Sequence, residues 1–222
     1  MKEYSTVLFD FDGTLLQSGP AIFATLREML REMGLPPRAD AELYPMVGPP
    51  LREGFMRHLG IPEAQVMRAL ELYRAKAPAV EAALGVQTFA GVPALLRALR
   101  AAGKQTAMVT AKLRATTERH VVSCGLEGRL DMVFAAENNL HCDKAGMIVE
   151  AMAALHASPK TTVMVGDRVY DIEAANRAGV DSIGVLYGYG SRGELMAAGA
   201  TYLVNTVEEL MQFLINKEGN AI

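Results

Sequence analysis

The second half of the chain alternates between two patterns of apolar residues. Short unbroken apolar runs are typical of buried strands, whereas longer segments repeat apolar residues at helical spacing. The strands predicted in this half are Thr106–Val109, Met132–Ala135, Thr161–Val165, Ser182–Leu186 and Tyr202–Val204. The helices predicted between them are Leu113–Ser123, Ala145–Leu155, Ile172–Ala178 and Arg192–Ala198. This alternation predicts βαβ units, and therefore an α/β domain with a doubly wound parallel sheet.

The first half of the chain follows a different pattern. One strand, Thr6–Phe11, precedes a region with helical periodicity and no comparable apolar run. The helices predicted in this half are Pro20–Met33, Leu51–Leu59, Glu63–Ala77 and Val92–Ala102, the last leading back to the sheet. The pattern therefore predicts a core domain of residues 1–16 and 86–222, with a small α-helical domain of residues 17–85 inserted into it.

Composition and charge exclude several classes of protein. Of 222 residues, 50% are hydrophobic and 21% are charged, which excludes a disordered or fibrous chain. The 22 Lys and Arg residues against 25 Asp and Glu give a net charge of -3, without the basic excess that nucleic-acid binding requires. No apolar stretch approaches the roughly 18 residues of a membrane span. We therefore expect a cytoplasmic protein with no nucleic-acid or membrane partner.

Acidic residues follow two of the predicted strands at the point where each strand ends. Asp10 and Asp12 lie at the end of the first strand, and Asp167 and Asp171 follow a later one. Open α/β sheets bind their ligands at this edge. Two unit charges about 4 Å apart repel by about 4 kcal/mol at an effective dielectric of about 20. The sequence therefore predicts a cation among the four carboxylates, and their hard oxygen ligands favour Mg²⁺.

Groups suited to binding an anion lie between these acidic pairs. Thr110 and Ala111 follow a predicted strand at a helix entry, where a hydroxyl and backbone N–H groups are available. Lys144 lies at the start of another predicted helix, where a positive charge is unfavourable unless an anion is close by. Carboxylates, hydroxyl, amides and ammonium together indicate metal-assisted phosphoryl transfer.

These residues resemble the four motifs of the haloacid dehalogenase superfamily, in the same order and across essentially the whole chain. The segment Asp10-Phe11-Asp12-Gly13-Thr14-Leu15 is similar to the first motif, and Gly166-Asp167 with Asp171 is similar to the fourth. Thr110 is similar to the second motif and Lys144 to the third.

The inserted helical segment resembles the small cap of subfamily I of that superfamily. Two further segments, Gly48-Pro49-Pro50-Leu51-Arg52 and Gly188-Tyr189-Gly190-Ser191, resemble the phosphoglycolate phosphatase-like branch. The resemblance implies a Rossmann-like core domain and a helical cap domain that closes over the catalytic edge.

The resemblance also implies a mechanism. Asp10 would attack phosphorus as the nucleophile and form an aspartyl-phosphate, while Asp12 would give a proton to the leaving alkoxide and later take one from water. Mg²⁺ would be held by Asp10, the backbone carbonyl of Asp12 and Asp167, with Asp171 assisting directly or through a water. Dehalogenases expel a halide and characteristically lack an acid at the position of Asp12, so a phosphatase is favoured.

Substrate-binding roles follow from the same resemblance. Thr110 and the Ala111 amide would hold phosphoryl oxygens, and Lys144 would neutralise charge on the phosphoryl group and on the nucleophile. Lys112 competes for the ammonium role, but motif order favours Lys144, and we expect Lys112 to be a solvated surface lysine. Arg52 is a candidate for binding a substrate carboxylate or a second phosphate. The alternative is that Arg52 is an ordinary surface arginine.

The expected function is a Mg²⁺-dependent phosphatase that hydrolyses a small, phosphoglycolate-like phosphate monoester. Its partner would be a small phosphorylated metabolite, and the protein would be a monomer or a homodimer. Three enzymatic alternatives stay open: a phosphomutase of the β-phosphoglucomutase type, an inorganic pyrophosphatase and a nucleoside 5′-monophosphatase. A non-catalytic phosphate-binding module is a further alternative, which the intact acidic residues disfavour.

Overall fold

The computed structural model describes residues 2–138 and 142–215, and its centre is one six-stranded parallel sheet. The strands are β1 (Thr6–Phe9), β2 (Gln105–Leu113), β3 (Met132–Ala136), β4 (Thr162–Gly166), β5 (Asp181–Val185) and β6 (Tyr202–Val204). Their order across the sheet is β3-β2-β1-β4-β5-β6, which confirms the predicted doubly wound parallel α/β fold.

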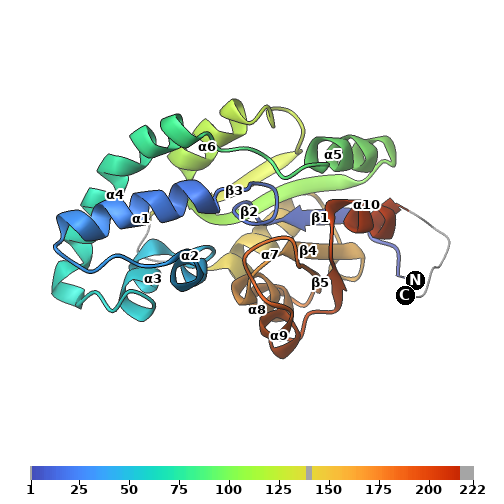
Figure 1. The fold of residues 1–222 in the computed structure, drawn as a ribbon. Helices are drawn as coiled ribbons and strands as arrows, with labels where there is room; N and C mark the ends of the chain where they lie inside the picture. Colours follow the sequence, from blue (N-terminus) through green and yellow to red (C-terminus); the bar gives the residue numbers. More distant parts are fainter. Residues whose placement is uncertain (1, 139–141, 216–222) are drawn as a thin grey trace.

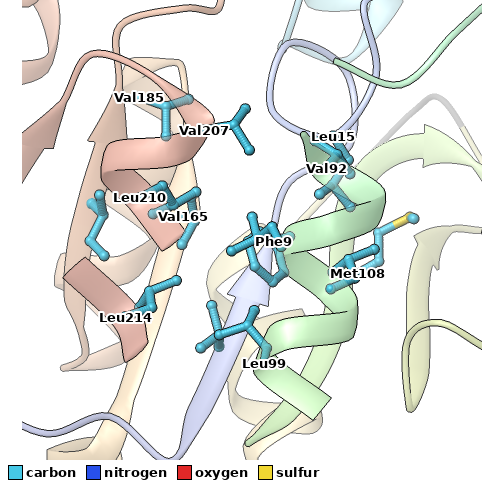
Figure 2. Close-up of a cluster of buried hydrophobic side chains, with 14 of the residues drawn as sticks. Phe9, Leu15, Val92, Leu99, Met108, Val165, Val185, Val207, Leu210 and Leu214 are labelled. Carbon is cyan, nitrogen blue, oxygen red and sulfur yellow. The ribbon is translucent and has the colours of Figure 1, made fainter. Parts of the chain in front are cut away.

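Helices cover both faces of this sheet. They are α5 (Val92–Ala101), α6 (Arg114–Ser123), α7 (Lys144–Ala154), α8 (Val169–Ala178), α9 (Arg192–Ala197) and α10 (Val207–Ile215). Phe9 of β1 packs with Leu99 of α5 and Leu210 of α10 on one face (Figure 2). The neighbouring Leu8 belongs to the cluster on the other face, with Ile148 of α7. A central strand buried on both faces explains its unbroken apolar sequence.

The inserted segment forms a helical layer with its own hydrophobic cluster. Its helices are α1 (Gly19–Glu32), α2 (Asp40–Leu43), α3 (Leu51–Arg57) and α4 (Glu63–Leu84), with a short 3₁₀ turn at Tyr44–Met46. Leu26, Phe55 and Leu70 are buried together there. Figure 1 shows these helices gathered at one end of the molecule, away from the two chain ends. The inserted segment therefore forms a helical layer of its own beside the sheet.

Two chain segments connect the layers, and they pair with each other. Leu16 and Thr88 form an antiparallel bridge, and the Gln17 N–H donates to the Gln87 carbonyl at 2.9 Å. We propose that the domains divide here, as the sequence suggested: residues 1–16 and 86–222 against residues 17–85.

Two elements, β2 and α4, extend furthest beyond the bounds that the sequence predicted. Strand β2 runs through Thr110 to Leu113 because its pairing with β3 continues past a register shift, so Thr110 does not lie at a helix entry. Helix α4 continues through Pro78 to Leu84, although a proline usually ends such a helix. No helix among the described residues is long and apolar enough to cross a membrane.

Candidate active site

The site lies where the central strands end. Phe9, at the end of β1, pairs with Met108 of β2 on one side and with Val165 of β4 on the other. The backbone positions just beyond these residues therefore share one edge of the sheet. This register brings Asp10, which follows β1, next to Asp167, which follows β4.

Three buried aspartates form a cluster at this edge. Carboxylate oxygens of Asp10, Asp167 and Asp171 all lie within 4.8 Å of one another. Asp171 comes from the first turn of α8, and Lys144 is the first residue of α7. The Lys144 Nζ donates to Asp10 Oδ1 at 2.5 Å and also to Asp171 Oδ1. Two of the three carboxylates, those of Asp10 and Asp171, therefore share one ammonium group.

Burial changes the ionisation of these groups. Burial raises the pKa of Asp10 to about 7, although the adjacent Lys144 acts in the opposite direction. Burial and the nearby Asp171 raise the pKa of Asp167 well above its ordinary value. Burial by itself lowers the pKa of Lys144, but the carboxylates of Asp10 and Asp171 outweigh it and raise that pKa. These pKa shifts share one cause, because negative charge is concentrated where little water reaches it. A divalent cation would offset this charge.

The donor set fits Mg²⁺. All three cluster ligands are hard carboxylate oxygens, and the described part of the cluster contains no His or Cys. Asp167 is fixed by Thr14 Oγ1, which donates to Oδ1 at 3.3 Å, and by the Tyr189 N–H, which donates to Oδ2 at 2.8 Å. A Cβ at Gly13, whose φ is +89°, would lie 2.1 Å from Asp167 Oδ2. The backbone thus approaches the carboxylate as closely as only glycine permits.

Asp12 pairs with a different lysine. Both of its carboxylate oxygens accept hydrogen bonds from Lys112 Nζ at 3.0 Å. The Lys112 side chain is only 12% exposed, so the expectation of a solvated surface lysine is wrong. Lys112 lies two positions after Thr110 on the extended strand β2, and alternate residues of a strand project to the same side.

A cavity of about 290 Å³ lies between the core and the helical layer. Its core lining includes Asp10, Asp12, Thr110, Ala111 and Lys112. Its lining from the helical layer includes Met46, Gly48, Pro49, Leu51 and Tyr73. One end of the cavity is therefore charged and polar, and the inserted segment supplies mostly apolar walls together with Arg74 and Glu81 of α4.

The structure brings together most of the residues that the sequence singled out. The aspartates Asp10, Asp12, Asp167 and Asp171 lie with Lys144, Thr110 and Ala111 at one edge of the sheet. Arg52 is different: it is not among the described residues that line the cavity, and it pairs with the exposed Glu63 at 2.5 Å. This position agrees with the surface-arginine alternative and gives no support to a substrate contact.

Besides the pair of Lys112 with Asp12, sequence reasoning missed two contacts that hold the site. Tyr189 binds Asp167 through its backbone N–H, and its hydroxyl accepts a hydrogen bond from the Gly19 N–H at 2.7 Å. Arg168, which follows Asp167 directly, is buried and reaches the helical layer. The glycines on both sides of Tyr189 are a sequence signal for a close approach of the backbone. No sequence pattern indicates the direction of the Arg168 side chain.

Comparison with known proteins agrees with this geometry. The chain is 33% identical to tyrosine-protein kinase PtkA of Mycobacterium tuberculosis over 213 residues, covering 94% of this chain and 72% of that protein. It is 29% identical to a 5′-nucleotidase of Pseudomonas aeruginosa, covering 95% of this chain and 96% of that protein. A crystal structure of a predicted phosphatase from Clostridium acetobutylicum superposes with a TM-score of 0.87 at 31% identity, covering 96% of this chain and 99% of that one.

The family described as haloacid dehalogenase-like hydrolase matches residues 7–185. This range runs from β1 to the end of β5 and contains every aspartate of the buried cluster, the two site lysines and the inserted helices. The chain therefore belongs to the haloacid dehalogenase-like hydrolase family.

Proposed function

We propose that this phosphatase of the haloacid dehalogenase-like family hydrolyses a small phosphate monoester, with Mg²⁺ as its cofactor, through an aspartyl-phosphate on Asp10. One observation supports the proposal most directly. Asp10 lines the cavity, its Oδ1 lies 2.5 Å from the ammonium of Lys144, and it shares a carboxylate cluster with Asp167 and Asp171. A nucleophile, a counter-charge and a set of metal ligands thus meet at one point.

In the first step, an Asp10 oxygen forms a bond to phosphorus while the bond from phosphorus to the leaving alkoxide breaks. Asp12, protonated at the start of this step, gives its proton to that alkoxide and becomes a carboxylate, which Lys112 keeps directed into the cavity through bonds to both oxygens. In the second step, Asp12 takes a proton from water, and the water oxygen displaces Asp10 from phosphorus. Inorganic phosphate and the free nucleophile result.

Charge stabilisation comes from the groups around the nucleophile. Lys144 neutralises negative charge that builds up beside Asp10, and the Thr110 hydroxyl and Ala111 amide supply donors along the cavity. Asp10, the Asp12 backbone carbonyl, Asp167 and Asp171 would hold Mg²⁺. When bound, Mg²⁺ supplies electrostatic stabilisation of the phosphoryl oxygens.

Two relatives suggest different acceptors for the phosphoryl group. The 5′-nucleotidase of Pseudomonas aeruginosa favours hydrolysis of a nucleoside monophosphate, in which water is the acceptor. The tyrosine-protein kinase PtkA makes transfer to a tyrosine hydroxyl a second candidate function. The two differ in one measurable respect, because only hydrolysis releases inorganic phosphate in amounts equal to the substrate consumed.

The test is phosphate release from 2-phosphoglycolate, a nucleoside 5′-monophosphate, glucose 1-phosphate, pyrophosphate and p-nitrophenyl phosphate, each with Mg²⁺ and with EDTA. We expect Mg²⁺-dependent release from at least one ester, and its loss in Asp10→Asn. Asp40→Asn, an exposed cap residue, is the matched control. Equal release by Asp10→Asn and wild type would refute the role of Asp10. With ATP as the phosphoryl donor, phosphate transfer to a tyrosine peptide without net release would favour the kinase.

A further inference from the structure

Arg168 reaches from the core to the inserted helical layer. It directly follows the predicted metal ligand Asp167, and it is only 5% exposed. Its Nη1 donates to the backbone carbonyl of Tyr44 at 3.1 Å and also to that of Val47. The family motif accounts for the aspartates around this position and gives no role to the arginine between them. This buried guanidinium has hydrogen-bond partners in both layers, and the proposed mechanism gives it no role.

The guanidinium is anchored on the core side. Its Nε donates to Glu194 Oε1 at 2.8 Å, and the same oxygen accepts the Val169 N–H at 2.9 Å. A buried charge is costly unless it is paired and its donors are satisfied. Glu194 supplies the countercharge, and the carbonyls of Tyr44 and Val47 accept the hydrogen bonds of the guanidinium Nη1. Arg168 is thus held in one orientation, with its Nη1 directed at the other layer.

The segment that Arg168 holds is the one that forms a wall of the cavity. The accepting carbonyls belong to Tyr44 and Val47, and the neighbouring residues Met46, Gly48 and Pro49 line the cavity. We call residues 44–49 the cap loop. Arg168 binds the backbone of this loop and does not itself line the cavity among the described residues.

Gly48 shows how closely the two layers meet. Its φ is +107°, and a Cβ there would lie 2.9 Å from Arg168 Cγ and 3.3 Å from Arg168 Cβ. A side chain at position 48 would therefore push against the arginine as well as strain the backbone. The missing side chain lets the cap loop lie directly on the arginine.

From these contacts we propose that Arg168 is a positioning residue that holds the cap loop over the cavity. Through this loop, Arg168 determines how tightly the enzyme binds the leaving group of its substrate. The inference rests on the proposed function for its kinetic consequence. The mechanical part, that Arg168 fixes the cap loop, is independent of any activity. The two parts are therefore tested by separate measurements.

The kinetic test compares Arg168→Met and Arg168→Lys with Arg177→Met, which removes an exposed arginine from α8, the helix that Arg168 directly precedes. We expect KM for p-nitrophenyl phosphate to rise about tenfold in Arg168→Met, with kcat changed much less, because uniform substrate binding is lost. Arg168→Lys should be intermediate, because it keeps the charge but not the planar fork. Acetyl phosphate, whose leaving group is small, should be hydrolysed within about twofold of the wild-type rate. An equal loss with both compounds would contradict the inference.

The mechanical test is amide hydrogen exchange over residues 43–52. If the free energy needed to open this segment locally falls by about 1–2 kcal/mol, its amide hydrogens exchange about 5- to 30-fold faster. We expect this change in Arg168→Met and no change in Arg177→Met. Wild-type exchange in Arg168→Met would overturn the inference whatever the kinetics show, whereas an inactive wild type with faster exchange in the variant would refute only the proposed function.

A variant on the other side of the contact covers the case in which Arg168→Met does not fold. Gly48→Ala should also raise KM and speed exchange in the cap loop. Gly34→Ala is its matched control, because Gly34 has a φ of +69° but no heavy atom within 4 Å of the added Cβ. If the two alanine variants behave alike, backbone strain explains the result and the Arg168 contact does not.

Discussion

Replacing Lys144 with methionine isolates the charge that balances the buried cluster. The variant keeps an unbranched side chain of similar length but leaves Asp10 and Asp171 without the ammonium group that both now contact. Side-chain exposures of 8% for Lys144, 4% for Asp10 and 2% for Asp171 show that water cannot replace it easily. The change therefore tests whether the site is held by electrostatic compensation.

The expected magnitude follows from this burial. Removing one partner of a buried ion pair typically costs about 3–5 kcal/mol of unfolding free energy. A chain of this size loses about 2–4 °C in Tm for each kcal/mol, so we expect Lys144→Met to lower Tm by about 6–20 °C in EDTA. Loss of one charge-stabilising donor should lower kcat about 10²- to 10³-fold. Mg²⁺ should narrow the difference in Tm, because it supplies positive charge to the same carboxylates.

The assay is thermal unfolding with and without Mg²⁺, followed by phosphate release. Lys160→Met is the matched control, because Lys160 is exposed, and its Tm should change by no more than about 2 °C. If Lys144→Met melts like Lys160→Met in EDTA, the cluster does not need its ammonium group. If Mg²⁺ raises the Tm of neither protein, the carboxylates are not the Mg²⁺ ligands.

Three further changes test neighbouring parts of the site. Saturation with Mg²⁺ at about 100 times its Kd should stabilise the wild type by about 2.7 kcal/mol, and EDTA should remove both this gain and phosphate release. Gly13→Ala should abolish the Mg²⁺-dependent gain in Tm, because its Cβ would lie 2.1 Å from Asp167 Oδ2, whereas Gly103→Ala, with a φ of +70° and no atom within 4 Å, should keep it. Lys112→Met should lower kcat more for poor leaving groups than for p-nitrophenolate, because Asp12 loses its orienting partner while p-nitrophenolate leaves without a proton. An equal loss for both kinds of leaving group would count against that role of Asp12.

The sheet and the position of the site could be predicted because they depend on local signals. A parallel strand buried on both faces has an unbroken apolar sequence, and each predicted run overlaps one of the observed strands. Once the sheet is parallel, residues that follow adjacent strands must meet at one edge. This rule alone brings Asp10 and Asp167 together, although they lie far apart in the sequence.

The features that could not be predicted depend on packing between distant segments, which no local sequence pattern indicates. The direction of Lys112 follows from the extension of β2 past Thr110, which is decided by pairing with β3. Helix α4 passes Pro78 although the proline removes one backbone hydrogen bond, and packing against α1 stabilises the helix as a whole. Arg52 illustrates the same limit, since the orientation of α3 places it next to Glu63 rather than in the cavity.

The two missed contacts converge on one residue, and this links the metal site to the cap. Arg168 adjoins Asp167 in the chain and binds the cap loop, while Tyr189 donates its N–H to the Asp167 carboxylate and its ring packs against Phe23 of α1. The contacts that hold the cap loop and a contact that holds the predicted metal ligand therefore involve neighbouring residues of one segment, which follows β4.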